Sequence, residues 1–384
     1  ATYAGAGATQ NIREVLVASD LTGLSGATIN SLVLHNGDIV ASTRFFSGSG
    51  AGQTLTLTSG GLLFTRDLAG AGVYDLILNG FDNGLAVGGA NEYVIHVVNP
   101  DAATPSKNLV ATISSPLTSA ADITKSGRGT LVLSGVNTAG GGANRTTINE
   151  GTLQITDLDN IGGNTGALVF AGGTLRLSGS YGGDDLSTRT ITFLTGGGTI
   201  DTNGFSLVLA NSLGSGSGSF TKVDAGNLTL NATSARTGST TLTTGTITIG
   251  ANNALGVGGD LNVGAGTTLA LGANSISHGL VTSSGGSPLI TGNGTLTASA
   301  GFFFNHTGDT TIDAILAGSG GVLKAQANVV TLTGASTYTG TTEIQAGTLS
   351  FNSITNQCQS GQPHQPALHS QMPGFVRAVR LMPA

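Results

Sequence analysis

The stretch ITKSGRGTLVLSG at residues 123–135 decides the fold, because its parts recur along the chain. Its Gly-Thr-Leu triplet, with Leu or Ile in third place, occurs seven times, beginning at Gly129, Gly151, Gly173, Gly198, Gly245, Gly294 and Gly347. The first three copies follow one another at steps of 22 residues. Self-similarity at about 20 to 50 residues is typical of stacked architectures, in which each unit buries its apolar side against its neighbours.

The residues after each triplet alternate between apolar and polar side chains. Leu153 and Ile155, for example, flank Gln154. A period of two predicts a β-strand with one face in a core and the other in water. A step of 22 residues indicates one full coil per step, so Leu131, Leu153 and Leu175 are expected to stack as one inward row. The sequence therefore predicts an all-β solenoid with turns at the Gly- and Asn-rich segments between strands.

The sequence also contains a second, longer repeat that includes the Gly-Thr-Leu/Ile triplet. Residues 123–133 align with residues 220–230 and, more weakly, with residues 322–332. Three of the chain's four lysines share one position in these segments: Lys125, Lys222 and Lys324. Each is expected on the solvent side of a turn, where a charge discourages lateral aggregation of strands. A ligand-binding row of lysines is the alternative.

At these residues the sequence resembles a known family, the autotransporter-associated β-strand repeat. Residues 123–135 match the first half of its pattern, and residues 336–349, with a Tyr-Thr-Gly segment and a Gly-Thr-Leu triplet, match the second half. Residues 54–64 and 196–205 look like segments common between such repeats, so the resemblance covers most of residues 50–354. It implies a right-handed parallel β-helix in the passenger region of a surface or secreted bacterial protein, often carried by a separate C-terminal outer-membrane barrel.

The composition excludes several classes of protein. Charged residues make up 9% of the chain, Gly accounts for 63 of 384 residues, and Trp is absent. Disorder is disfavoured because 39% of the residues are hydrophobic, the net charge is only −6, and the apolar residues alternate regularly. The 14 Lys and Arg residues are thinly spread, which argues against nucleic acid as a partner.

The sequence carries no signal for crossing a membrane. Its apolar runs are a few residues long, whereas a spanning helix needs about 20. The chain begins at Ala1 in mid-pattern, so any export signal is expected to lie upstream or to have been removed. Cys358 is the single cysteine, so an internal disulfide cannot form.

Three regions are expected along the chain. Residues 1–120 alternate like strands but with weaker periodicity, and residues 121–354 carry the clear repeats. Residues 355–384 hold the Cys, both Met and four of the eight Pro, and no repeat continues there. Because proline cannot donate to a β-ladder, this tail is predicted to be irregular or disordered. We interpret it as a natural linker or as the product of a reading-frame shift or a chimeric end.

A carbohydrate-active enzyme is the alternative function, since parallel β-helices also carry polysaccharide lyases and hydrolases. Such sites need clustered acids or a proton abstractor. The acids considered are Asp157, Asp159, Asp184, Asp185, Asp201, Asp224, Asp260, Asp309 and Asp313. They are dispersed and mostly adjoin Gly or Asn. We interpret them as turn residues, because Asx side chains cap turns through their own backbone.

Metal and nucleophile sites are not predicted. Residues 157–162 resemble half of a calcium loop, but the distal Glu is missing. The histidines share no zinc-ligand spacing: His35, His96, His278, His306, His364 and His369. Residues 214–218 are interpreted as a flexible Gly/Ser loop rather than a nucleophile elbow. The Thr-x-Thr strands, such as residues 54–56, are explained by β-propensity and threonine pairing rather than by ice binding. No catalytic, cofactor-binding or metal-binding residue is therefore predicted.

The sequence predicts a noncatalytic structural stalk or adhesin-like passenger segment. The resemblance implies an extracellular or cell-surface location in a Gram-negative-type bacterium. It also implies attachment to an outer-membrane translocator barrel outside this chain, and carbohydrate or a host or matrix surface as the partner. The polysaccharide lyase or hydrolase on a β-helix stays open as the alternative.

Overall fold

The structure is a computed structural model that describes most of the chain in two compact units, residues 1–199 and residues 200–384. The residues described are 3, 6–38, 42–67, 73–89, 92–98, 109–179 and 185–351. The predicted tail from residue 355 lies outside them. The expected boundary near residue 120 stays a prediction, and it differs from the division between the two units.

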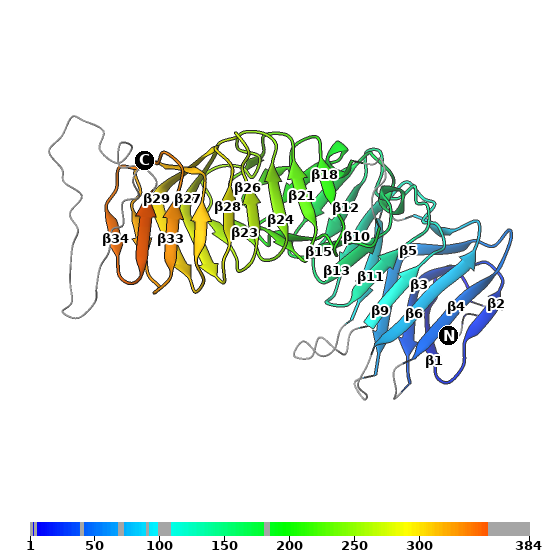
Figure 1. Ribbon diagram of the computed structural model, residues 1–384. Coiled ribbons are helices and arrows are strands. Elements are labelled where there is room, and N and C mark those ends of the chain that lie inside the picture. The colour runs from blue at the N-terminus through cyan, green and yellow to red at the C-terminus, as the bar shows by residue number, and fades with distance from the viewer. Residues whose placement is uncertain are drawn as a thin grey trace. The chain divides into compact units, whose positions relative to one another are not determined.

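The first unit consists of two parallel sheets, drawn in blue to green in Figure 1. The first sheet contains, in spatial order, β1 (Asn11–Leu16), β3 (Ala27–Asn36), β5 (Leu55–Arg66), β8 (Glu92–Val97), β10 (Asp122–Ser126), β12 (Arg145–Ile148), β14 (Ala167–Phe170) and β16 (Thr190–Phe193), with β7 (Leu85–Val87) beside β5. The second contains β2 (Leu21–Leu24), β4 (Thr43–Gly50), β6 (Tyr74–Phe81), β9 (Leu109–Ile113), β11 (Thr130–Leu133), β13 (Thr152–Ile155) and β15 (Thr174–Leu177). Consecutive strands of one sheet are therefore separated by a strand of the other, as in a solenoid.

Successive coils of this unit stack residue on residue. Leu131 is in register with Leu153, and Leu153 with Leu175. All three side chains are fully buried, while Gln154 on the opposite face is half-buried. The predicted inward row is confirmed, because alternation along each strand and a constant step between strands together fix one apolar column.

The strands nearer the N-terminus are longer and less regular. β3 has 10 residues and β5 has 12, whereas β11, β13 and β15 have 4 each. The pairing of β3 with β5 shifts register between Ile29 and Ser31. An extra residue of this kind bends a strand and disturbs its pairing. The irregular pairing agrees with the weak periodicity of this part of the sequence.

The second unit repeats the arrangement with two parallel sheets, drawn in green to orange in Figure 1. The first contains β20 (Phe220–Val223), β23 (Thr240–Leu242), β25 (Leu261–Val263), β27 (Ile276–Gly285), β29 (Thr295–His306), β32 (Val322–Lys324) and β34 (Thr342–Ile344), with β31 (Ile315–Ala317) beside β29. The second contains β18 (Leu207–Leu209), β21 (Asn227–Leu230), β24 (Thr246–Ile249), β26 (Thr268–Ala270), β28 (Leu289–Thr291), β30 (Thr310–Ile312), β33 (Val329–Leu332) and β35 (Thr348–Phe351). β19 (Ser215–Gly216) pairs with β22 (Ala235–Arg236).

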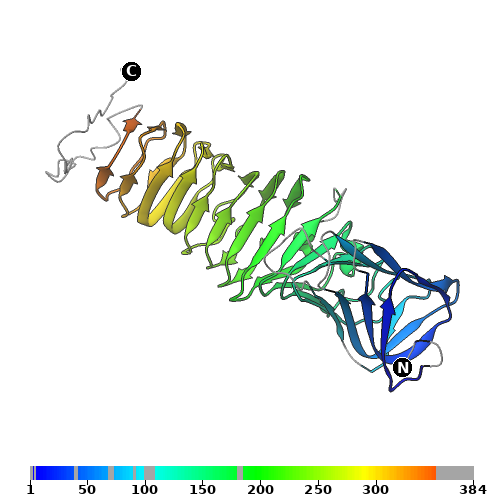
Figure 2. The ribbon, with the colours of Figure 1, turned by 90° about the horizontal axis from the view of Figure 1, so that it is seen from below.

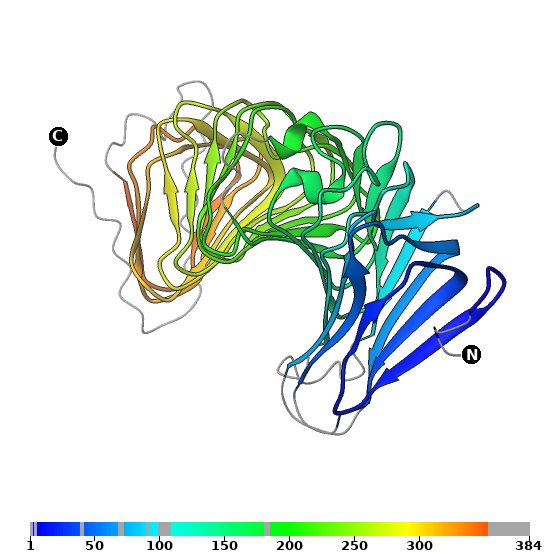
Figure 3. The ribbon, with the colours of Figure 1, turned by 90° about the vertical axis from the view of Figure 1, so that its right-hand side faces the viewer.

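The coils of the second unit enclose an aliphatic core. Figure 2 shows their strands side by side, and in Figure 3 the yellow and orange coils lie behind one another around a common interior. Leu228 is in register with Ile247, Ile247 with Leu269, and Leu269 with Ile290. All four are buried. The prediction of an all-β parallel solenoid is therefore confirmed.

Helical structure is confined to short turns in the part of the chain that the structure describes. The two 3-10 turns described are η2 (Leu158–Ile161) and η3 (Leu186–Thr188), both in the first unit. No helix among the described residues is long and apolar enough to cross a membrane.

Candidate functional site

Three lysines lie inside the solenoid rather than on its surface. Lys125 on β10, Lys222 on β20 and Lys324 on β32 have no exposed area. Each follows a buried apolar residue by two positions, so alternation places both side chains on the inner face. The expectation that these lysines face solvent is therefore wrong. Buried ammonium groups need partners within the fold, because loss of water is costly for a charge.

Main-chain carbonyls of two successive coils hold the Lys125 ammonium. Its Nζ donates to the carbonyl oxygen of Ser126 at 2.9 Å and to that of Gly127, which follow it in the same coil. The third acceptor is the carbonyl oxygen of Glu150 at 2.9 Å, in the next coil. Hydrogen bonds from a charged donor are stronger than those between neutral groups. Lys125 thereby joins its own corner to the corner stacked beside it.

Lys222 repeats this arrangement in the second unit. Its Nζ donates to the carbonyl oxygen of Val223 at 3.1 Å and to that of Asp224 in its own coil. The carbonyl oxygen of Thr244 accepts at 3.3 Å from the next coil. The hydroxyl of Thr202, 2.8 Å from Nζ, supplies a fourth oxygen. Two lysines 97 positions apart in the sequence thus have the same kind of surroundings.

Lys324 departs from the pattern in one partner. Its Nζ donates to the carbonyl oxygen of Gln326 in its own coil and to that of Ala346, 3.3 Å away in the next coil. The remaining acceptor is the side-chain oxygen Oδ1 of Asn328, at 2.6 Å. Asn328 is itself buried. We call the surroundings of Lys125, Lys222 and Lys324 the lysine corners.

The lysine corners explain the glycine that begins three of the seven triplets. Gly151, Gly245 and Gly347 each follow the carbonyl that a lysine of the previous coil contacts, and their φ angles are +67°, +78° and +73°. A Cβ on Gly151 would lie 2.4 Å from the carbonyl oxygen of Gly127, and one on Gly245 would lie 2.7 Å from Nζ of Lys222. Only glycine combines this left-handed backbone with so close an approach. The lysine and the glycine of one repeat therefore belong to one packing unit.

Burial changes the acidity of these lysines. Desolvation lowers the pKa of Lys125 to about 7, although the nearby Glu150 carboxylate opposes the shift. Desolvation also lowers the pKa of Lys222 to about 8, opposed by Asp224 and Asp201. Carbonyl dipoles stabilise the ammonium less than bulk water does, so the neutral amine is favoured more than in a free chain. The protonation of Lys125 and Lys222 is therefore expected to change near neutral pH.

Two arginines are buried in the same manner, and no pattern in the sequence predicts their burial. The guanidinium of Arg189 donates to the carbonyl oxygens of Gly163 at 2.7 Å and Gly140 at 2.5 Å. Arg236 donates to the carbonyl oxygen of Leu255 at 2.9 Å and lies over the ring of Phe220, 5.3 Å from its centroid. Desolvation lowers the pKa of both arginines to about 10. Buried cations in both units therefore bind main-chain oxygens.

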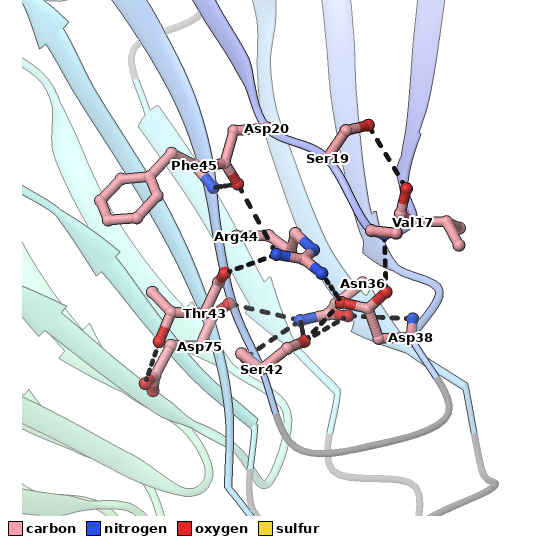
Figure 4. A network of polar contacts seen from close by, with 11 residues as sticks. Val17, Ser19, Asp20, Asn36, Asp38, Ser42, Thr43, Arg44, Phe45 and Asp75 are labelled. Carbon is pink, nitrogen blue, oxygen red and sulfur yellow. Dashed lines mark hydrogen bonds and ion pairs between the residues drawn. The ribbon is translucent and has the colours of Figure 1, made fainter.

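A separate polar cluster lies among the first coils (Figure 4). Asp38, whose side chain is 8% exposed, pairs with Arg44 at 2.6 Å. It also accepts hydrogen bonds from the hydroxyl of Ser42 at 2.6 Å and from the backbone N–H of Ala18 at 2.8 Å. Burial alone would raise the pKa of Asp38, but these hydrogen bonds and the Arg44 charge outweigh it and hold the pKa low. Asp38 is thus an ionised residue that ties neighbouring coils together.

The candidate acids are used mainly to hold turns. Asp157 caps η2 by accepting the N–H of Asp159 at 2.9 Å, and Asp185 caps η3 by accepting the N–H of Ser187 at 2.9 Å. Asp201 and Asp224 accept a backbone N–H in their own turns. Asp260 and Asp309 instead accept the N–H of Leu280 and Val329 in the next coil. Asp313 accepts the hydroxyl of Thr333 at 2.7 Å. Asp184 lies outside the described residues. The segment that resembles half of a calcium loop is accordingly a capped turn, with Asp157 directed at its backbone.

The described histidines have different partners. Those partners are Asp67 for His35, Ser126 for His96, the Gly259 carbonyl for His278 and Asn328 for His306. His364, His369 and Cys358 lie outside the described residues. Within the ranges that the structure describes, no three His, Cys, Asp or Glu side chains gather closely enough to hold a metal ion.

The lysine corners coincide with the matches to a known repeat family. Three segments match the family described as the passenger-associated-transport-repeat, at residues 123–155, 220–249 and 322–351. The chain carries passenger-associated transport repeats. Each repeat begins on the strand that bears a buried lysine and ends with a Gly-Thr-Leu/Ile strand. The sequence resemblance to autotransporter passenger repeats is therefore confirmed. No curated protein and no solved structure matches the chain.

Proposed function

We propose that the chain is a noncatalytic segment of an autotransporter passenger that acts as a structural stalk with adhesin-like display faces. The observation that carries the proposal is the lysine corner, repeated in all three matched segments. In each, a buried cation is committed to carbonyls of two successive coils. A polar group held in this way strengthens stacking and is withheld from bound substrates.

The physical role of such a segment is to act as a spacer that resists unfolding. Parallel backbone ladders connect successive coils, and the aliphatic rows are continuous within each unit. In a solenoid, stability is close to a sum of repeat terms and nearest-neighbour terms. Opening one coil therefore exposes apolar surface and breaks the backbone ladders on both of its sides. The free-energy cost of this opening keeps the segment folded and so protects it from proteases.

The outward faces would supply any adhesive contact. Thr229 and Thr248 are in register on the outer face of adjacent coils, as are Asn227, Thr246 and Thr268. Hydroxyl and amide groups of this kind suit carbohydrate or a host or matrix surface as a partner. We place the segment outside the cell, attached to a translocator that is not part of this chain. Binding to glycan and matrix-protein arrays tests this display role.

The assay that separates a stalk from an enzyme uses a panel of neutral and acidic polysaccharides. Reducing ends and unsaturated products are measured for the purified chain and for an empty-vector preparation. The double variant Asp184→Asn and Asp185→Asn serves as the matched control. Asn at position 185 keeps an oxygen that can cap η3, so the fold is expected to survive. We expect no turnover above background. Turnover that the double variant lacks would establish the alternative, a carbohydrate-active β-helix enzyme.

A further inference from the structure

The third lysine corner brings an amine against a side-chain amide, which the other two corners do not. Lys324 and Asn328 are both buried, and Nζ lies 2.6 Å from Oδ1. The residue four positions after Lys125 is Gly129, and the residue four positions after Lys222 is Gly226. Those two corners therefore have no amide in the place that Asn328 occupies.

The amide group of Asn328 is fixed in orientation from both ends. Its Nδ2 donates to the carbonyl oxygen of Gly308 at 2.6 Å and lies 3.3 Å from Nδ1 of His306. The other ring nitrogen of His306, Nε2, is buried and has no hydrogen-bond partner among the described residues. This pattern assigns the ring proton to Nε2 and leaves the Nδ1 lone pair facing the amide nitrogen. Oδ1 therefore faces the lysine, and Nδ2 faces a base.

We propose that Lys324 and Asn328 are joined by an intramolecular isopeptide bond that forms in the folded chain. Nζ, as the neutral amine, adds to the amide carbon Cγ, and the C=O electron pair moves to Oδ1. The amine proton passes to Nδ1 of His306 and from there to Nδ2. The electron pair on Oδ1 then re-forms the C=O bond, the bond from Cγ to Nδ2 breaks, and ammonia leaves. One amide replaces another, so the step needs no oxidant, reductant or co-reactant.

The surroundings favour this reaction in three ways. The amine and the amide are held in contact, and such positioning replaces an encounter in solution. Burial lowers the pKa of Lys324, against the opposing charge of Asp309, so the nucleophilic neutral form becomes accessible. Burial, reinforced by the Lys324 charge, lowers the pKa of His306 to about 4, so the ring is unprotonated at neutral pH and, as a weak base, would pass a proton on to Nδ2 rather than keep it.

The bond would change what this corner does. The buried ammonium becomes a neutral secondary amide, which removes the cost of a desolvated charge. One N–H remains on Nζ, so it can serve either Gln326 or Ala346 but not both. The ring of atoms closed from Lys324 to Asn328 would also fix the turn between β32 and β33. In the final matched repeat, the corner would thus gain covalent rigidity while it gives up one of its two hydrogen bonds to main-chain carbonyls.

Intact-mass spectrometry of the purified chain tests the proposal. The expected mass is lower than the sequence mass by one molecule of ammonia, and trypsin is expected to cleave after Lys125 and Lys222 but not after Lys324. A chain with the full sequence mass would overturn the proposal. A mass lower by one ammonia molecule together with normal cleavage after Lys324 would also overturn it. That result indicates a succinimide at Asn328, and a succinimide leaves the lysine side chain free.

Matched variants identify the atoms involved. The mass deficit is expected to vanish in Lys324→Arg and in Asn328→Ala, and to persist in Lys125→Met, which alters the equivalent corner of another repeat. A deficit that persists in Lys324→Arg would contradict the assignment. His306→Gln keeps a polar side chain but removes the base, and the isopeptide-bonded fraction is expected to fall at least tenfold at equal times after synthesis. An unchanged fraction would exclude His306 as the proton carrier.

Discussion

The strand bodies and the lysine corners of this solenoid bury their residues by different means. In the strand bodies, apolar side chains such as Leu131, Leu153 and Leu175 stack in register and need only to exclude water. At the corners, Lys125 and Lys222 are buried just as fully, and each requires carbonyl oxygens from its own coil and the next. Apolar packing in the strand bodies stabilises the stack of coils. Hydrogen bonds at the corners hold the turn of one coil in a defined position beside the turn of the next coil.

The largest expected effect concerns the strand bodies. Leu153→Asp places an unpaired carboxylate in a fully buried row, so the repeat region should lose about 4 kcal/mol of unfolding free energy or fail to fold. The neighbouring change Gln154→Asp, on the outer face, should alter it by about 0.5 kcal/mol. Urea unfolding followed by circular dichroism gives both values. Equal midpoints for the two variants would show that the strand faces are wrongly assigned.

The next effect concerns the corners. Lys125→Met keeps an unbranched side chain but leaves three carbonyl oxygens without their donor, so we expect a loss of about 2 kcal/mol. The matched control is Arg128→Gln, which removes an exposed ion pair with Glu150 in the same corner and should cost at most about 1 kcal/mol. The same unfolding experiment applies. A Lys125→Met chain as stable as the unchanged chain would mean that the lysine merely fills space.

The same comparison explains what could be predicted from the sequence. The inward row of Leu131, Leu153 and Leu175 depends only on local alternation and a constant step, and both are visible in one sequence. The burial of Lys125 was also signalled, because it shares parity with Ile123 two positions earlier. The alternation outweighs the charge here, because carbonyl oxygens of two coils replace the water around the ammonium.

The partners of the buried cations could not have been predicted. Lys125, Lys222 and Lys324 contact carbonyl oxygens of the next coil at Glu150, Thr244 and Ala346, three residue types with nothing in common. Any residue supplies a main-chain carbonyl, so such a contact leaves no pattern at the acceptor residue itself, and its only trace is the glycine that follows. Arg189 and Arg236 were overlooked for the same reason, since they also bind main-chain oxygens.

A smaller effect should appear as a dependence of stability on pH. The folded pKa of Lys125 is about 7, below its ordinary value of 10.5, so between these values the unfolded chain binds more protons than the folded chain. Stability should therefore rise with pH across this window, by up to about 1.4 kcal/mol per pH unit for each such lysine. Lys222, with a folded pKa of about 8, acts in the same direction.

Comparison of the unchanged chain with the Lys125→Met variant isolates the contribution of Lys125 to the pH dependence of stability. Unfolding free energies are measured between about pH 7 and pH 9, where ordinary histidines are neutral and tyrosines are still protonated. Tyr3, with its pKa raised to about 12 by burial, stays protonated throughout. The rise in stability should be shallower in the variant. Identical slopes would indicate that the Lys125 ammonium keeps its ordinary acidity.

Native-state labelling of lysines measures the burial of Lys125 and Lys222 in the folded chain itself. The folded chain is treated briefly with an amine-reactive ester, and each lysine is quantified by peptide mass spectrometry, with the urea-unfolded chain as reference. An Arg128→Lys variant adds an exposed lysine to the first corner, since Arg128 has a side chain that is 59% exposed. Lys125 and Lys222 should remain unlabelled while position 128 reacts at once. Labelling of Lys125 and Lys222 in the folded chain as fast as in the unfolded chain would contradict the account.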